Sequence, residues 1–171
     1  MEHIQRTSKK ELKINKFKIC LLEKRQQYDE TYARGQIHID GFCESFLSPL
    51  AFWKKIDYYE NWIDQLSRLD VTGRAFLPTT MYPVEVTNFI FGWSIYIEGE
   101  AAYLQNNMII ANDIVGNYDI HALEKVLRPR AIITEDGLKI SEWKTTRTAI
   151  SDFLLRLRKK ISCHPSRGRK T

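Results

Sequence analysis

The sequence predicts an α+β fold in which antiparallel sheets carry flanking helices. Residues 89–110 alternate between apolar and other side chains on both sides of a turn at Glu98-Gly99-Glu100. A second pair of short strand-like segments flanks Asp136-Gly137. Two further segments, 57–70 and 147–160, repeat apolar residues at helical spacing. At 171 residues the chain is long enough for one domain with a single core.

The first half of the chain supplies three elements before the main hairpin. Residues 36–40 fit a short strand, and the sequence before them fits neither a clean strand nor a clean helix. Asp57 followed by Glu60 resembles a capping box, and the helix it opens stops at Gly73. Residues 74–81 fit a strand whose Pro78 favours an edge or a bulge, because proline cannot donate to a central ladder.

The central hairpin is predicted over about residues 88–110. One face of its first strand is apolar throughout, formed by Phe89, Phe91, Trp93, Ile95 and Ile97. We expect Phe89, Phe91 and Trp93, together with Trp62, to belong to the core. Two strands are not stable alone, so further strands or a helix must cover this face.

Three consecutive amides, Gln105-Asn106-Asn107, interrupt the second strand of the hairpin. Such side chains either satisfy buried backbone groups or line a recognition surface. The sequence leaves both alternatives open.

The last third of the chain predicts a helical turn over 121–127, a second hairpin and a final helix. The second hairpin covers about 131–143, since Glu135-Asp136-Gly137 contains a strong turn signal. The C-terminal helix covers about 147–160, and its Arg/Lys run suits the negative end of a helix dipole.

Charge divides the chain into three parts. Residues 1–36 hold nine Lys/Arg and five Asp/Glu, and residues 156–171 hold seven and none, which leaves 37–155 with ten basic and 16 acidic residues. We therefore predict a basic N-terminal extension at 1–36, a single domain at 37–160 and a basic, flexible tail at 161–171. The acidic central part favours a basic partner.

The ends of the chain and its cysteines indicate a cytoplasmic protein. The first residues are charged where a secretory signal is apolar, and no apolar run approaches the length of a membrane span. Cys20, Cys43 and Cys163 are too far apart for a ligand pair, and an odd count does not suit a disulfide framework.

Catalytic chemistry has little support in the residues. The four histidines lack metal-ligand spacing, no glycine-rich phosphate loop or nucleophile elbow is present, and His121 with Glu124 is an isolated pair. We expect no metal, no cofactor and no enzymatic activity. The carboxylates at predicted turns are either solvated loop tips or a negative patch that meets a positively charged partner.

Four blocks of the sequence occur in a distinctive order and spacing: DYYENW at 57–62, TTMYP at 79–83, TNFIFGWSIYIEGEAAYLQNNMII at 87–110 and DGLKISEW at 136–143. They resemble the CdiI immunity family of bacterial contact-dependent growth inhibition systems. The resemblance spans roughly residues 46–157 and is similar in particular to the branch whose best-known member neutralises a ribonuclease acting on small-subunit ribosomal RNA. It implies an α+β immunity-type domain, similar to Whirly-type single-stranded-nucleic-acid-binding proteins, that inhibits by binding.

The leading hypothesis is a cytoplasmic immunity protein that binds the C-terminal toxin domain of a CdiA-type protein, expected to be a basic nuclease. The residues that we expect to form its acidic toxin-binding face are Glu98, Glu100, Asp113, Glu135 and Asp136. No membrane or direct nucleic-acid partner is expected, and the oligomeric state stays open. The alternative is a single-stranded nucleic-acid-binding module whose basic ends track phosphates while Tyr96 or Tyr103 stacks on bases.

Overall fold

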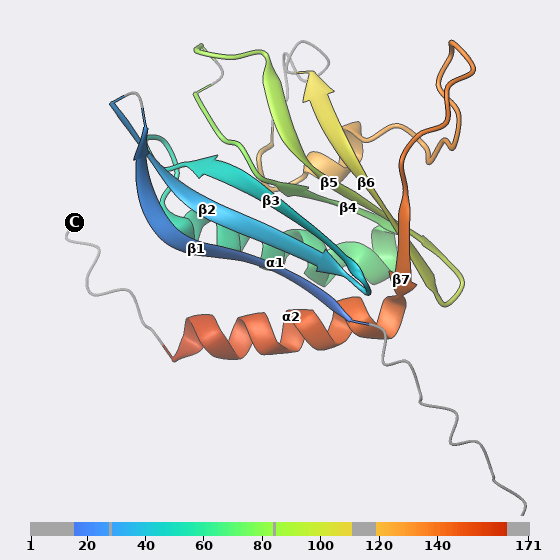
Figure 1. Ribbon diagram of the computed structural model, residues 1–171. Coiled ribbons are helices and arrows are strands. Elements are labelled where there is room, and N and C mark those ends of the chain that lie inside the picture. Colours follow the sequence, from blue (N-terminus) through green and yellow to red (C-terminus); the bar gives the residue numbers. More distant parts are fainter. Residues whose placement is uncertain (1–15, 28, 84, 111–118, 164–171) are drawn as a thin grey trace, which may run out of the picture.

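The computed structural model of the protein describes residues 16–27, 29–83, 85–110 and 119–163. Figure 1 shows two antiparallel sheets, with helices beside them, which confirms the predicted α+β class. The first sheet has the order β1-β2-β3, formed by Phe17–Gln27, Glu30–Ile39 and Phe42–Pro49. The second has the order β4-β5-β6-β7, formed by Arg74–Pro78, Phe89–Glu98, Ala101–Ile110 and Trp143–Thr146.

Helix α1 (Lys55–Thr72) ties the two sheets together. The Tyr59 hydroxyl donates to the Leu21 carbonyl of β1 at 3.1 Å, while the Trp62 indole donates to the Pro78 carbonyl of β4 at 2.9 Å. Both side chains are buried. The apolar face that the sequence predicted for this helix therefore packs into the core between the helix and the two sheets.

The ends of α1 agree with their sequence signals after a small shift. The helix begins two residues before Asp57, whose carboxylate accepts the Lys54 backbone N–H at 2.7 Å from the third helical position. It ends at Gly73, which adopts the left-handed conformation with φ of 68°. Helix α2 (Arg147–Ser162) begins at the predicted residue, with Thr146 accepting the Ala149 N–H at 3.1 Å.

The central hairpin is confirmed as β5 and β6. They pair from Glu98↔Ala101 at the turn to Phe89↔Ile110 at the far end. Gly99 supplies the positive φ that the tight turn requires. Strand β4 lies at the edge of the sheet and ends at Pro78. This position agrees with the prediction, because a proline has no N–H to donate to a central ladder.

Part of the predicted core is wrong. Trp62 and Trp93 are buried as expected, but Phe89 and Phe91 are 43% and 47% exposed. Two aromatic side chains cover the part of the β5–β6 face around Trp93: Phe42 from the first sheet and Trp143 from β7. Their rings stack on each other with centroids 4.1 Å apart. The opposite face, with Ile90 and Ser94, is also buried, so β5 is covered on two sides over part of its length.

The folded domain begins earlier than predicted. Residues 17–36, assigned to a basic extension, form β1 and most of β2, and the predicted boundary at 37 falls inside β2. Phe17 is buried against Phe153 of α2, with ring centroids 5.1 Å apart. A register shift between Leu21 and Lys24 breaks the alternation along β1, which explains why its sequence fits no single period. At the other end, α2 includes Ile161 and Ser162 of the predicted tail.

The second predicted hairpin is much reduced. A single bridge joins Ile133 to Lys139 around a turn in which Gly137 has φ of 80°, and the flanking residues are irregular. Trp143 instead begins β7 and pairs with Leu104 of β6. The predicted helical turn at 121–127 is present as the 3-10 helix η2 (Leu123–Val126). Similarity to Whirly-type proteins stays a prediction.

Two general features complete the fold. None of the helices in the described ranges is long and apolar enough to cross a membrane. The three cysteines are free thiols, with Cys20 buried and Cys43 and Cys163 exposed.

Candidate functional site

The most prominent exposed segment is the stretch from Arg130 to Glu142, which we call the arm. It connects η2 to β7, and every side chain from Ala131 to Lys139 is exposed. The exposed residues include the acidic turn Glu135-Asp136 and three large aliphatic side chains, Ile132, Ile133 and Leu138. Exposed aliphatic groups beside charges on a surface loop are typical of a site that binds another macromolecule.

The base of the arm is held by a polar cluster centred on Arg130. Its guanidinium binds Glu142 through two bonds of 2.7 and 2.6 Å and contacts Glu98 at 2.8 Å. The same group lies 3.7 Å from the ring centroid of Tyr103. Gln105 donates to Glu142 and to the Ala131 carbonyl, each at 2.8 Å. Because Arg130 and Glu142 are the two ends of the arm, the cluster closes the loop on rigid strands.

The arm should loosen in acid. The hydrogen bond from Arg130 holds the pKa of Glu142 below its ordinary 4.5. A carboxyl whose pKa is depressed by folding contributes stability that is present above its unfolded pKa and is lost as the pH falls through its folded pKa. We expect the Gln105 side-chain amide and the amides of 131–141 to lose protection in NMR spectra with a midpoint below pH 4.5.

The variant E142Q is the control for this acid transition, because its side chain cannot titrate. The arm of this variant should be loose already at neutral pH and should show no separate acid step. A midpoint at or above pH 4.5 in the wild-type protein would contradict the role of Arg130.

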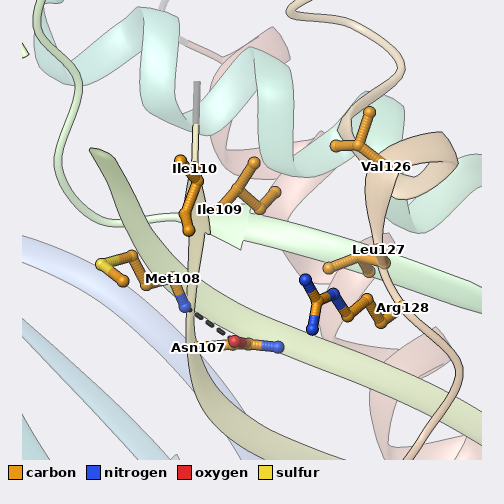
Figure 2. A pocket seen from close by; sticks show the side chains of 7 residues that line it. All are labelled: Asn107, Met108, Ile109, Ile110, Val126, Leu127 and Arg128. Atoms are coloured by element: carbon orange, nitrogen blue, oxygen red, sulfur yellow. Dashed lines mark hydrogen bonds between the residues drawn. The ribbon is translucent and has the colours of Figure 1, made fainter. Parts of the chain in front are cut away.

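A groove separates the arm from the second sheet. Its lining includes Gln105 and Asn107 of β6 on one side and Ile133, Glu135 and Asp136 of the arm on the other. Beyond Asn107 a second pocket follows β6 towards Ile110, and its other wall is the segment 126–128 (Figure 2). Asn107 and Arg128 line both pockets, so the two adjoin, and we call them together the groove.

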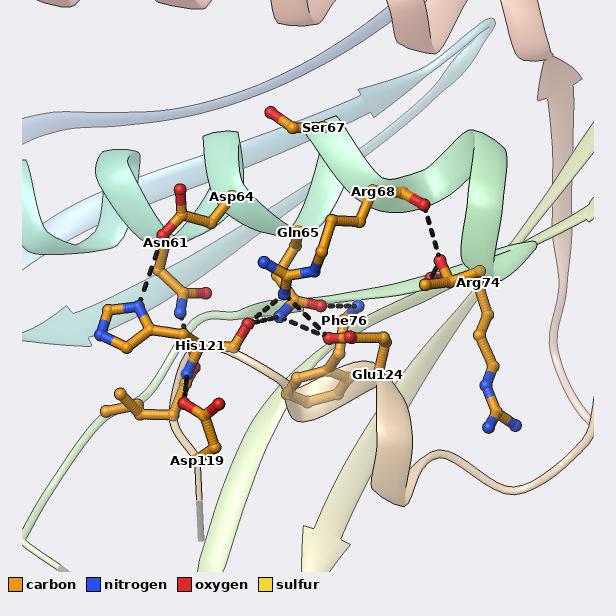
Figure 3. Close-up of polar contacts among 12 residues, drawn as sticks. Asn61, Asp64, Gln65, Ser67, Arg68, Arg74, Phe76, Asp119, His121 and Glu124 are labelled. Atoms are coloured by element: carbon orange, nitrogen blue, oxygen red, sulfur yellow. Dashed lines mark hydrogen bonds and ion pairs between the residues drawn. The ribbon is translucent and has the colours of Figure 1, made fainter.

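The segment that precedes the arm is fastened to α1 by buried polar contacts (Figure 3). Glu124 is 3% exposed and accepts bonds from Gln65 at 3.0 Å and Arg68 at 3.1 Å. Asn61 donates to the Ile120 carbonyl at 2.8 Å. These contacts satisfy a buried carboxylate and fix the root of the arm to the core helix.

His121 and Glu124, the pair on which an enzymatic interpretation depended, have different partners. The His121 ring lies 3.4 Å from Asp64, whereas Glu124 is bound by Gln65 and Arg68. Within the described ranges, no three His, Cys, Asp or Glu side chains are arranged to hold a metal ion. The contacts of both residues are those of a structural anchor.

The four predicted site residues within the described ranges lie in three places, at the base of the arm, at its tip and in the β5–β6 turn. Glu98 belongs to the base of the arm and is paired with Arg130. Glu135 and Asp136 form the tip, where Glu135 lies 4.0 Å from Arg128. Glu100 lies in the β5–β6 turn, where its carbonyl accepts the backbone N–H of Arg147 at the start of α2 at 3.0 Å. Asp113 lies outside the described residues.

The amides and tyrosines singled out in the sequence also have defined places. Gln105 satisfies the Ala131 carbonyl, the first of the two alternatives, while Asn106 is exposed and donates to Glu44 at 3.0 Å. Tyr96 is 6% exposed, with its hydroxyl donating to the Arg128 carbonyl, and Arg130 covers a face of Tyr103. The expectation that Tyr96 is exposed for stacking on bases is therefore wrong.

Sequence reasoning missed the residues that build the arm. Arg130 and Glu142 are twelve positions apart, and nothing in their spacing indicates that they meet. Glu142 does lie in the DGLKISEW block, so a carboxylate inside an otherwise structural motif was the available signal.

An α+β scaffold that presents a fastened, exposed arm defines a protein that acts by binding a macromolecular partner. The chain belongs to the CdiI immunity family, since residues 48–153 match the family model described as the CdiI N-terminal domain. It is 36% identical to the immunity protein CdiI of Enterobacter cloacae subsp. cloacae over 120 residues, which cover 70% of this chain and 82% of that protein.

A solved structure agrees with this assignment. The fold is similar to a chain of the CdiA-CT/CdiI toxin and immunity complex from Enterobacter cloacae, with a TM-score of 0.77 and 32% identity. The similarity covers 84% of this chain and 99% of that chain.

Proposed function

We propose that this protein is a cytoplasmic immunity protein that binds the C-terminal toxin domain of a CdiA-type protein and neutralises it without catalysing a reaction. The observation that carries the proposal is the similarity to a chain of a toxin and immunity complex over nearly the whole of that chain. The arm supports it, because it offers aliphatic and acidic groups on a loop whose two ends are held.

The toxin is proposed to be a nuclease. An enzyme that acts on a polyanion carries a basic surface, and an inhibitor that covers this surface needs the opposite charge. The folded region 17–162 as a whole is nearly neutral, with 19 acidic and 18 basic residues, but the arm places Glu135 and Asp136 together at its exposed tip. Complementary charge would also speed capture of the toxin before damage occurs.

The proposal is tested by a pull-down of the tagged protein from its own host at about physiological ionic strength, with added nuclease. Mass spectrometry should identify a toxin domain in roughly stoichiometric amount that survives nuclease treatment. Co-expression should then protect growing cells from that domain. Recovery of nuclease-sensitive material alone would favour the nucleic-acid-binding module.

Reversal of the two tip charges tests the acidic contact. The variant E135K/D136K should bind the captured toxin domain about tenfold or more weakly, and its affinity should depend less on salt. Titration calorimetry at two salt concentrations measures both effects. The control E60K/D152K changes the net charge equally at two exposed helix positions and should bind as the wild type does. Equal loss in both variants would show that only overall charge matters.

A further inference from the structure

Among the described residues, no strand pairs with the outer edge of the far half of β6, which we call the open edge. Strand β7 pairs with β6 only from Ala101 to Leu104, so residues 105–110 have no strand neighbour on that side within the described part of the chain. The Met108 backbone N–H does not extend a ladder there and donates instead to the Asn107 side-chain oxygen at 2.8 Å (Figure 2). An open strand edge is a template for another extended segment.

The same half of the hairpin carries large apolar side chains on one face of the sheet, and two of them, Met108 and Ile110, also line the groove at the strand edge. Two cross-strand pairs, Phe89↔Ile110 and Phe91↔Met108, place four large side chains together. Their exposed fractions are 43%, 36%, 47% and 40% in that order. Four adjacent exposed apolar side chains on a sheet are typical of a surface that a partner covers.

The groove supplies apolar contacts on the other side of the edge. Ile109, Val126 and Leu127 line it in Figure 2, and Ile133 lines its continuation under the arm. A strand added to β6 would point alternate side chains to the two sides. One set would meet Met108 and Ile110, and the other set would enter the groove.

Charge distinguishes the two ends of this surface. The end under the arm is bordered by Glu135 and Asp136, whereas Ile110 and Val126 border the far end. Arg128 lines both parts and lies 4.0 Å from Glu135, so the acidic excess at the arm is one charge. A segment that fits the whole groove therefore has alternating apolar residues and a Lys or Arg where it reaches the arm.

We infer that an extended segment of the toxin domain adds to the second sheet as a strand along residues 105–110 of β6. Its backbone pairs with the open edge, its apolar side chains cover Met108 and the groove, and a basic side chain meets Glu135 and Asp136. This inference rests on the proposed function and specifies how the partner is held.

A second copy of this chain fits the edge less well. Two copies paired through the same edge would each bring an acidic tip to the shared groove, because Asn107 of β6 and Glu135 and Asp136 of the tip line the same cavity. Like charges brought together in this way oppose association. A basic toxin segment has no such conflict.

Amide hydrogen exchange on the full-length protein, measured by NMR with and without the captured toxin domain, tests the backbone pairing. Binding should slow exchange of the Met108 amide, and of the amides next to it on the open edge, about tenfold or more. Amides inside the β4–β5 ladder report global stability and serve as the internal reference.

Two side-chain variants test the apolar contacts. F91Q and M108Q should each weaken toxin binding about tenfold or more, since truncating a central apolar contact commonly has this effect. V71Q and L155Q are matched controls, because Val71 and Leu155 lie on helices and are 91% and 56% exposed. These two substitutions also remove exposed apolar surface, but away from the groove. All four positions are exposed, so the fold should persist, which circular dichroism checks.

The outcomes separate this inference from the proposed function. If the wild-type protein captures no toxin domain, the proposed function fails. If it captures one while Met108 exchange and the affinities of F91Q and M108Q stay unchanged, the toxin binds elsewhere and only this inference is overturned. A wild-type dimer in light scattering that F91Q and M108Q dissociate would assign the edge to a second copy and would also overturn it.

Discussion

Replacement of Arg130 with alanine is expected to release the arm and to weaken toxin binding about 10- to 100-fold. The side chains of Arg130 and Glu142 are 20% and 15% exposed, so the change leaves a part-buried carboxylate without its cation. Loss of one partner from such a pair destabilises by about 1 to 3 kcal/mol. A released arm must then be ordered again when the toxin binds, which lowers the affinity.

Amide exchange over residues 131–141 and calorimetric binding of the captured toxin measure the two consequences of R130A. The variant R130K should be intermediate, because lysine keeps the charge but cannot form the two parallel bonds to Glu142. R147A is the control, since Arg147 contacts Asp70 at 2.8 Å in a pair that is much more exposed. An ordered arm in R130A would contradict the role assigned to this cluster.

Replacement of Trp62 with alanine should lower the free energy of unfolding by about 4 kcal/mol. The side chain is fully buried, and its indole donates to the Pro78 carbonyl across the junction of α1 with the second sheet. The variant combines a large cavity with an unpaired buried carbonyl. Urea denaturation followed by circular dichroism measures the change.

The control for W62A is F52A, because Phe52 is an aromatic residue that is 47% exposed near the start of the same helix. It should change the stability by less than about 1 kcal/mol. If W62A were no more destabilising than F52A, α1 would not be the element that joins the two sheets.

Local patterns in the sequence were sufficient for several elements. Helix α1, the β5–β6 hairpin and helix α2 were predicted nearly at their observed bounds. Each repeats its apolar residues with one period, and glycines with positive φ end α1 at Gly73 and form the hairpin turn at Gly99. Strand β1 was missed because its register shift breaks the period on which such a prediction depends.

The candidate site was predicted only in part. Glu135 and Asp136 were placed at an exposed turn, because the Asp-Gly signal is local. The ion pair of Glu98 with Arg130 was not predicted, since the two residues are 32 positions apart in the chain. The exposure of Phe89 and Phe91 was also missed, because an apolar strand face looks the same in sequence whether a neighbouring sheet covers it or not.

The sequence by itself determined the α+β class, the main helices and hairpin, and the acidic character of the central region, because periodicity, turn chemistry and charge are properties of neighbouring residues. Only the tertiary structure decided where the covering sheet ends, which carboxylates are paired and which strand edge stays open. Those features depend on contacts between residues far apart in the chain, whose geometry arises from packing and is not encoded in any local pattern.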